Sequence, residues 1–230
     1  MERLRDPRER AARAARILDA AADLLLRHGY RRVSIDDVAA GAGIGKGTVY
    51  LHWKSRDQLF SAVFTREVCL AIDEVRQALA DEPRTALLHR FAHAYFLAIA
   101  RRPLLRGFLL ADAELIGRLT VDLDDRHATM AQGYFELLAG HGLLCADMDV
   151  AEVGYAYQAT FEGFLRAQED GASADGWEPR ADLLARTVRR AFESGAVLPD
   201  SVMRELAAAT GALFTEMIDA DLAASGIRAG

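Results

Sequence analysis

The amino-acid sequence predicts an all-α protein. The chain has 230 residues and is 51% hydrophobic, which is enough apolar material for a core. Its apolar residues recur at helical spacing, and the alternation typical of strands is absent. Proline and glycine fall between the periodic stretches, where helices end. The length exceeds the ~100–200 residues of one typical domain, so we expect a moderate domain with a small appendage.

The first helix is expected at about residues 8–28. One of its faces carries Ile17, Ala21, Leu24 and His28. Gly29 follows in the position just beyond a helix C-terminus. Ser34 is a favourable N-cap for a second, short helix. The residues expected on the inner face of that helix are Ile35, Val38, Ala39 and Ala42.

A tight turn is expected between this helix and a third. In the pattern Ala39-x3-Gly43-x5-Val49, the small alanine lets two backbones approach and the glycine can adopt a positive φ. The valine fills the angle between the helices, so the segment is a helix-turn-helix. Its recognition helix is expected at about 45–51. At ~1.5 Å per residue it is roughly 10 Å long, which suits a major groove ~12 Å wide.

The side chains expected to face outward suit DNA. Lys46 and Thr48 can reach base edges or phosphates, while Gly45 and Gly47 permit close approach of the backbone. Beyond them, polar residues able to meet phosphates alternate with apolar residues expected to pack inward: Tyr50, His52 and Lys54 with Val49, Leu51 and Trp53. Backbone amides at the helix starts after Ser34 and Ser55 are further candidate phosphate sites.

Charge is distributed unevenly along the chain. Residues 1–56 contain 12 Lys+Arg and 7 Asp+Glu, a balance of +5, whereas the other 174 residues contain 16 and 27, a balance of −11. The only two lysines, Lys46 and Lys54, lie in the basic part. A basic arm able to add salt-dependent affinity for DNA is formed by Arg3, Arg5, Arg8, Arg10 and Arg13. The asymmetry indicates a basic contact module on an acidic body.

The rest of the chain is expected to continue as helices. Ser55 and Gln58 have the spacing of a capping box, which should open a long helix running toward Ala80. Further helices are expected at about 84–101, 104–117, 121–140, 149–169, 180–194 and 200–224.

Other kinds of site are less well supported. Gly45 and Lys46 do not complete a phosphate-binding loop, because Gly47 follows where Ser or Thr is needed and no strand precedes. His89 and His93 lie four residues apart without an evident third ligand, so no metal and no cofactor is expected. A glycine-rich turn of purely structural role stays open, as does an all-α enzyme or binding protein whose helix-turn-helix does not bind DNA.

Cellular context follows from composition. Cys69 and Cys145 are far apart in the sequence and do not suggest a disulfide scaffold or a zinc site. No apolar run approaches the ~18 residues of a membrane span, and the N-terminus is charged rather than leader-like. The sequence therefore predicts a soluble, cytoplasmic protein without a membrane partner.

The run from Ser34 to Phe60 resembles the TetR family of transcriptional regulators. The resemblance covers residues 10–65 and is carried by Lys46-Gly47-Thr48-x-Tyr50-x-His52-x-Lys54 and the capped helix that follows. Trp53 stands where an aromatic residue, often Phe, is usual. The resemblance implies a three-helix DNA-binding head, here 1–56, and a helical ligand-binding and dimerisation body, here 57–230.

The resemblance also implies function. Such proteins are usually homodimers, most often repressors that bind an inverted-repeat operator in double-stranded DNA and are released by a small-molecule effector. The residues implied to face the operator are Lys46, Gly47, Thr48, Tyr50 and His52. Those implied to hold phosphates are Lys54, Arg56 and the helix start at Ser34.

The body contains a candidate dimer interface. The helix expected at 149–169 carries a stripe of small residues, Ala156, Thr160, Gly163 and Ala167. Together with residues of the next helix they fit a two-fold four-helix interface, and these are Leu184, Thr187, Val188 and Ala191. Ordinary packing within one chain is the alternative reading of the same stripes.

An effector pocket would have to be built from the central helices. The aromatic candidates are Phe91, Tyr95, Phe108, Tyr134, Tyr157 and Phe161, with His93 or Glu114 as polar anchors. Each aromatic residue taken alone is more typical of a core than of a pocket. Residues 196–230 extend past the usual family body, and we expect them to add an amphipathic helix that packs on the core or on a partner.

Overall fold

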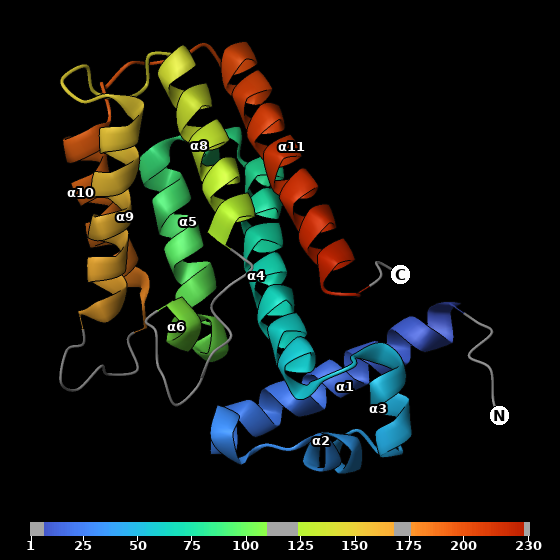
Figure 1. The fold of residues 1–230 in the computed structure, drawn as a ribbon. Coiled ribbons are helices and arrows are strands. Elements are labelled where there is room, and N and C mark those ends of the chain that lie inside the picture. The colour runs from blue at the N-terminus through green and yellow to red at the C-terminus, as the bar shows by residue number, and fades with distance from the viewer. Residues whose placement is uncertain (1–6, 110–123, 168–175, 228–230) are drawn as a thin grey trace. The chain divides into compact units, whose positions relative to one another are not determined.

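The computed structural model describes residues 7–109, 124–167 and 176–227, and these are folded almost entirely as α-helices (Figure 1). Within these ranges the only β pairing is an isolated bridge between Leu144 and Glu193. The predicted all-α class is confirmed. No helix in the described ranges is long and apolar enough to cross a membrane.

The described residues group into two compact units. The first draws on 1–69, 103–123 and 219–230, and the second on 70–102 and 124–218. We expect a functional boundary between residues 56 and 57, whereas the compact units divide within a helix, after Cys69. Two long helices, α4 (Arg56–Asp81) and α11 (Asp200–Ala224), begin in one unit and end in the other.

The first unit contains one long helix, α1, and several short ones around one core. They are α1 (Pro7–His28), the 3₁₀ turn η1 (Tyr30–Arg32), α2 (Ile35–Gly41), α3 (Lys46–His52) and α6 (Pro103–Leu109). Their buried apolar side chains meet those at the start of α4, where Leu59, Phe60 and Val63 are fully buried. Phe108 of α6 packs on Phe64 with ring centroids 5.2 Å apart. These contacts hold α2 and α3 against α1 and α4.

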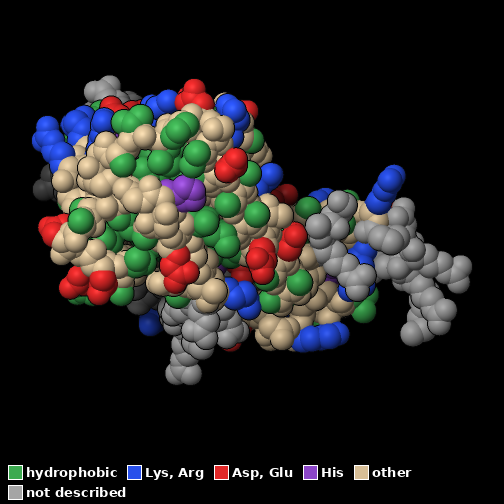
Figure 2. Space-filling view, turned by 90° about the horizontal axis from the view of Figure 1, so that it is seen from above, with side chains coloured by type: hydrophobic (Ala, Val, Ile, Leu, Met, Phe, Trp, Pro, Cys, Tyr) green, Lys and Arg blue, Asp and Glu red, His purple; other side chains and the backbone are tan. Residues whose placement is uncertain are grey.

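The second unit is a bundle of longer helices lying alongside one another (Figure 1). It consists of the rest of α4, η2 (Pro83–Ala86), α5 (Leu88–Ala100), α8 (Asp124–Gly140), α9 (Val150–Arg166), α10 (Glu178–Phe192) and most of α11. Aromatic rings fill its core, because Phe91 contacts both Tyr134 and Phe214. On the face shown in Figure 2, apolar side chains occupy much of the surface, with acidic ones spaced among them.

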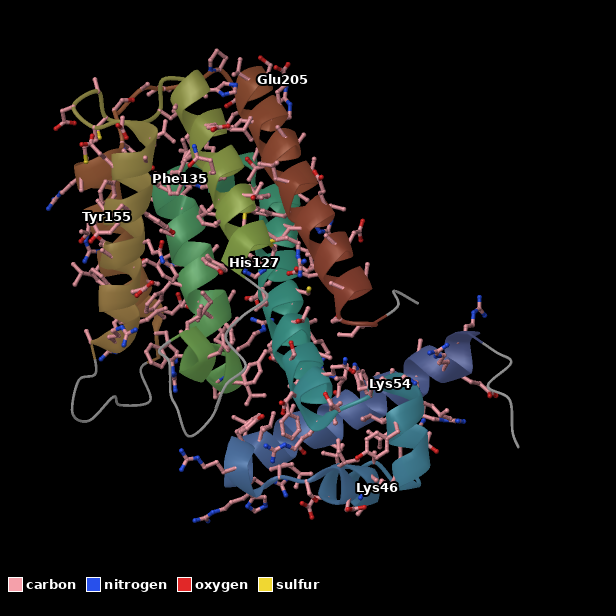
Figure 3. The ribbon with its side chains drawn as sticks, in the orientation of Figure 1. Lys46, Lys54, His127, Phe135, Tyr155 and Glu205 are labelled. Carbon is pink, nitrogen blue, oxygen red and sulfur yellow. The ribbon has the colours of Figure 1, made fainter. Side chains whose placement is uncertain are left out.

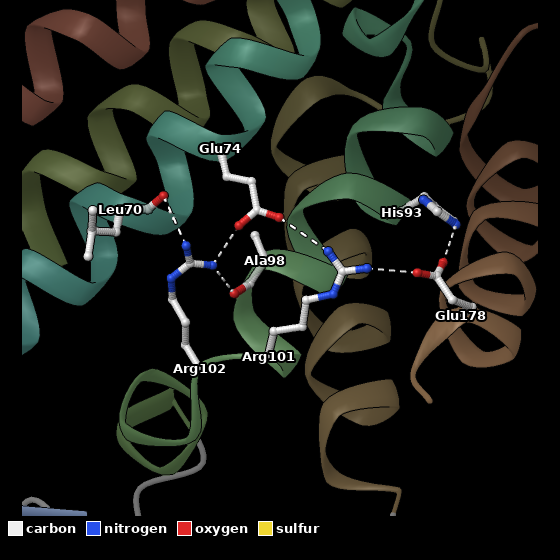
Figure 4. Close-up of polar contacts among 7 residues, drawn as sticks. All are labelled: Leu70, Glu74, His93, Ala98, Arg101, Arg102 and Glu178. Atoms are coloured by element: carbon white, nitrogen blue, oxygen red, sulfur yellow. Dashed lines mark hydrogen bonds and ion pairs between the residues drawn. The ribbon is translucent and has the colours of Figure 1, made fainter. Parts of the chain in front are cut away.

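Ion pairs tie the end of α5 to two neighbouring helices (Figure 4). Arg102 donates to Glu74 of α4 at 2.8 Å and to the carbonyls of Leu70 and Ala98. Arg101 donates to Glu178 of α10 at 2.7 Å and lies 3.4 Å from Glu74. Arginines at a helix C-terminus also interact favourably with its dipole.

The observed bounds agree closely with those expected for the first helix and for 200–224. The stretch 84–101 is split instead, because Leu87 adopts extended backbone between η2 and α5. Ser55 caps α4 by accepting from the Gln58 amide, but the Gln58 side chain accepts from Lys54 rather than from Ser55. The expected segments 104–117 and 121–140 partly fall outside the described residues.

Candidate nucleic-acid interface

The turn between α2 and α3 has the geometry that the sequence requires. Ser34 caps α2 in a capping box with Asp37, not with the Glu or Gln that is usual there. Gly43 has φ 65°, a region that favours glycine, and the amide of Ile44 donates to the carbonyl of Ala39 at 3.0 Å. Val49 is fully buried in the angle between the helices. The predicted helix-turn-helix is confirmed in the structure.

Helix α3 has one buried and one exposed side. Val49 and Trp53 are buried and lie four residues apart, on the same face. Leu51 is 57% exposed, so the expectation that it packs inward was wrong. The reason is that α3 remains helical through His52, and a helix repeats every 3.6 residues rather than every two.

The residues of α3 predicted to contact DNA lie mostly on its exposed side. Lys46, Gly47 and Tyr50 are exposed, and Thr48 is half-buried. An added Cβ at Gly45 or Gly47 would meet no atom within 4 Å, so the space beside the start of α3 is open. Figure 3 shows Lys46 at this end of α3 and Lys54 just past the other end. Two cationic groups thus bracket an open helix surface.

Lys46 also has a partner within the head, by which we mean residues 7–56. Its ammonium lies 2.7 Å from the Asp36 carboxylate of α2. The hydrogen bond to Asp36 raises the pKa of Lys46, and the charge of Asp36 adds to the effect. Since both side chains are largely exposed, the pair is weak and a DNA phosphate can compete for the lysine.

His52 is held differently from its neighbours. Its ring stacks on Trp53 with centroids 5.4 Å apart, and its Nε2 is buried without a hydrogen-bond partner among the described residues. Burial lowers the pKa of His52, and the charges of Arg10 and Arg13 lower it further. The imidazole is therefore neutral near pH 7, and Nε2 must be uncovered before it can contact an operator.

Two predicted phosphate sites already have partners within the protein. The Ser34 amide and hydroxyl both donate to Asp37, and the hydroxyl's hydrogen bond lowers the pKa of Asp37. The Arg56 guanidinium lies 4.4 Å from the centre of the Tyr30 ring and donates to the carbonyls of Tyr30 and Val33. Arg56 thus joins η1 to α4, and its role toward phosphates would need these bonds to be shared.

Two further basic residues lie beside the predicted site. Arg31 and Arg32 are exposed in η1, directly before the Ser34 cap of α2. A pair of arginines next to a helix N-terminus could have identified them as phosphate candidates. Of the predicted arm, Arg8, Arg10 and Arg13 lie on α1, and Arg3 and Arg5 lie outside the described residues.

Most predicted effector residues come together in the second unit. Tyr95 stacks on both Phe91 and Phe161, and Tyr157 contacts Phe161. Tyr134 donates to the carbonyl of Ala86 at 2.9 Å. The Tyr157 hydroxyl, by contrast, is buried without a hydrogen-bond partner among the described residues. Burial raises the pKa of Tyr95 to about 12 and that of Tyr157 well above its usual value.

The remaining effector candidates are not part of this cluster. Phe108 belongs to the first compact unit, and Glu114 lies outside the described residues. His93 lies 3.3 Å from Asp182 and lines a separate cavity of about 360 Å³. The other residues lining this cavity are Ala78, Thr85, His89, Arg90, Ala94 and Ala185. In the described ranges no three potential ligands are grouped to hold a metal ion.

The dimer candidates divide into two groups. Leu184 and Val188 are fully buried within the chain, so they belong to its core and the expectation that they form an interface was wrong. The small side chains of α9 remain accessible, with Ala156 and Thr160 half-buried and Gly163 and Ala167 exposed. On α10, Thr187 is half-buried and Ala191 is exposed. The stripe of α10 that faces inward was mistaken for one that faces outward.

Comparison with known proteins agrees with this geometry. Residues 17–63, which span α1 to α4, match the family model described as bacterial regulatory proteins, tetR family. The chain thus carries the DNA-binding region of the TetR family. This family consists of DNA-binding transcriptional regulators, which are generally not enzymes.

Two curated relatives and one solved structure extend the comparison. The chain is 36% identical over 70 residues to the transcriptional activator FasR of Mycolicibacterium smegmatis, covering 30% of this chain and 32% of FasR. It is 29% identical over 168 residues to an uncharacterized HTH-type regulator of Mycobacterium bovis, covering 73% of this chain and 84% of the relative. The crystal structure of AibR with isovaleryl coenzyme A and operator DNA matches at a TM-score of 0.58 and 22% identity, covering 78% of this chain and all of AibR. The chain therefore shares its fold with AibR beyond the head.

Proposed function

We propose that this TetR-family protein is a homodimeric repressor that binds an inverted-repeat operator and is released by a small molecule bound in the second unit. The observation that carries the proposal is the two-sided character of α3. Val49 and Trp53 fix one side in the core, while Lys46, Thr48 and Tyr50 lie on the other.

The chemistry of that exposed side suits a duplex. The Thr48 hydroxyl and methyl group can contact base edges, and Gly45 and Gly47 let the backbone come close to the groove. Lys46 and Lys54 supply charge for phosphates at the two ends of α3, and Arg31 and Arg32 add to it near α2. Phosphate contacts supply affinity, and base contacts supply specificity.

Dimerisation is supported by exposed stripes on α9 and α10. Tyr155 is 80% exposed on α9 (Figure 3), in line with Ala159 and Glu162. Leu183 is 49% exposed on α10, in line with the exposed Arg186 and Arg190. A two-fold axis would place the apolar residues of the two stripes together and the glutamate of one copy near the arginines of the other.

The aromatic cluster of Phe91, Tyr95, Tyr134, Tyr157 and Phe161 is the proposed effector site. A buried hydroxyl without a partner costs free energy, and a ligand with a hydrogen-bond acceptor would remove that cost at Tyr157. AibR was solved with an acyl coenzyme A as well as operator DNA. A ligand that prefers one arrangement of the two heads shifts the equilibrium by its difference in affinity, typically ~1–3 kcal/mol.

The proposal is tested by selecting duplexes from a random DNA library with the full-length protein. An inverted repeat with half-site centres about 34–36 Å apart, or a multiple of this, is expected. Recovery of no duplex, or of single half-sites bound by a monomer, would contradict it. Paired spin labels on the two heads then report whether an effector that releases DNA changes their separation.

Two variants separate base contacts from phosphate contacts. Thr48→Ala should lower the ratio of operator to random-duplex affinity, because it removes a base contact worth about 1–3 kcal/mol. Lys54→Ala should weaken both affinities and lower the salt slope by about one unit. Fluorescence anisotropy across a salt series measures both, with Thr215→Ala on the exposed side of α11 as control. An unchanged affinity ratio in Thr48→Ala would exclude that residue from base readout.

An all-α enzyme is the second candidate, and the cavity beside His89 and His93 is the observation that favours it. His89 lies 2.9 Å from both carboxylate oxygens of Glu193, as a general base held by an acid would. The carboxylate is equally a structural link between α5 and the end of α10. The enzyme would be favoured if the DNA selection failed and if the protein showed a catalytic activity that His89→Gln abolishes.

A further inference from the structure

The C-terminal end of α11 contributes to the first compact unit, although most of α11 belongs to the second. Helix α11 ends at Ala224, and Gly226 has φ 72°, which reverses the chain after the helix. Ile227 then packs, partly buried, against the core shared by α1, α2, α3 and α4. Asp221, one turn before the helix ends, is fully buried. The C-terminal end of α11 is therefore held on the core of the first unit by its own side chains.

Its backbone also makes one specific bond to the recognition helix. The indole Nε1–H of Trp53 donates to the carbonyl of Ser225 at 3.3 Å, across 172 residues of sequence. Trp53 is the C-cap of α3, and its amide donates to the carbonyl of Val49. Its side chain is 3% exposed. The terminus thus contacts the residue that ends the recognition helix.

The bond supplies the acceptor that a buried indole N–H needs. The acceptor is the carbonyl of the residue that directly follows α11. Phe at position 53 would keep an aromatic ring, but it is smaller than Trp and could not donate a hydrogen bond. Trp53 thus links the end of α3 to the C-terminal end of α11, which lies outside the head.

We propose that Ser225–Ile227 is a positioning element for the recognition helix, so that operator affinity depends on the far C-terminus of the chain. The inference rests on the proposed DNA-binding function. The terminus fixes the Trp53 ring, and the ring in turn sets where α3 ends and how His52 stacks against it. Lys54, the phosphate candidate that follows, is held in the same way through the backbone of Trp53.

The chain contains two tryptophans, Trp53 and Trp177, so Trp177→Phe leaves Trp53 as the only indole fluorophore. In that background, deletion of residues 225–230 should move the emission of Trp53 to longer wavelength and increase its quenching by acrylamide. Deletion of residues 228–230 alone keeps the proposed element and serves as the matched control. Unchanged emission and quenching after the longer deletion would overturn the proposal.

A second arm measures DNA binding in the full-length protein. Gly226→Val should lower operator affinity about tenfold and weaken random-duplex binding as well, because a β-branched residue disfavours positive φ, displaces Ser225 and with it the support of Trp53 and Lys54. Gly211→Ala is the control, since this α11 glycine has open space and no positive φ. Circular dichroism confirms that each variant remains helical.

Trp53→Phe completes the test by removing the N–H while keeping an aromatic ring. It should lose a similar factor in operator affinity, and Gly226→Val should add little in the Trp53→Phe background. If the double variant lost operator affinity by the product of the two single-variant factors, the two residues would act independently and the proposal would be overturned. If selection yields no operator, the regulatory function fails and the positioning role fails with it, while the fluorescence arm still reports whether the terminus covers Trp53.

Discussion

The lysine that begins the recognition helix pairs with a neighbour in sequence, whereas several polar pairs in the second unit join helices distant in sequence. Lys46 pairs with Asp36, ten residues away. In the second unit, Arg101 pairs with Glu178 across 77 residues, and His89 with Glu193 across 104. A surface built from local contacts can form before the rest of the chain is arranged. Ion pairs between distant helices can instead change when those helices move.

The difference matches the proposed roles of the two regions. A DNA-reading surface needs a fixed geometry, and Gly43, Val49 and the Ser34 cap supply it within about 20 residues of sequence. An effector-responsive body needs two arrangements of similar free energy. Its links at the end of α5 are partly exposed and can be exchanged at modest cost.

The largest expected effect breaks the geometry of the head. Gly43→Ala and Gly142→Ala place the same residue at the same φ of 65°, and neither new Cβ would meet an atom within 4 Å. Both should lower stability by up to about 2 kcal/mol through backbone strain alone. Only Gly43→Ala should also weaken operator binding, because Gly142 lies in a loop of the second unit. Urea unfolding measures the stability of both variants, and DNA titration measures their operator affinity. An equal loss of operator affinity in both variants would contradict a local origin of the binding defect.

The next comparison lies within the aromatic core of the second unit. Tyr134→Phe removes a hydrogen bond and leaves the buried Ala86 carbonyl without it, which should cost about 1.5 kcal/mol. Tyr157→Phe removes a hydroxyl that has no partner among the described residues, so stability should stay equal or rise. Urea unfolding of both variants measures the difference. Destabilisation by Tyr157→Phe as large as that by Tyr134→Phe would show that its hydroxyl is satisfied in solution.

A smaller effect is expected where distant helices are linked by charge. Glu74→Gln weakens the contacts with Arg101 and Arg102, which at 40% side-chain exposure should cost about 0.5 kcal/mol. Glu205→Gln, on the exposed side of α11 (Figure 3), should cost nothing measurable. Once an effector is known, Glu74→Gln should also change the concentration needed to release DNA. Indistinguishable melting curves for the two variants would argue against a role for the Glu74 link.

The smallest effect concerns the pH response of the head. Burial lowers the pKa of His52 in the folded protein, so the unfolded chain binds the proton more readily. Stability should therefore fall as the pH drops through the unfolded value of about 6.5 toward the lower folded value. His52→Gln should show a smaller loss between about pH 7.5 and pH 5.5. A loss of the same size in the variant would assign the pH dependence to other groups.

What could be predicted from sequence follows the same division between local and distant contacts. The cap at Ser34, the turn at Gly43 and the buried Val49 depend on neighbours in sequence, and their positions were predicted correctly. Leu51 was misplaced because an alternating pattern was applied to residues that continue a helix.

Contacts between distant residues could not be predicted in this way. Leu184 and Val188 form a regular helical stripe, but only tertiary structure shows that it faces the chain's own core. The bonds of Arg56 to η1 and of Trp53 to Ser225 join residues that no spacing rule connects. The sequence therefore indicates the class of ligand for the head but not the geometry of the body.

The placement of the two lysines has a practical consequence. Both side-chain amines of the protein lie at the ends of α3, on the surface proposed to meet DNA. A reagent that acylates amines would modify this surface and, apart from the chain's N-terminus, no other part of the molecule. Mass spectrometry of the labelled peptides, with and without duplex, would thus record a footprint of the complex at Lys46 and Lys54 without any substitution in the protein.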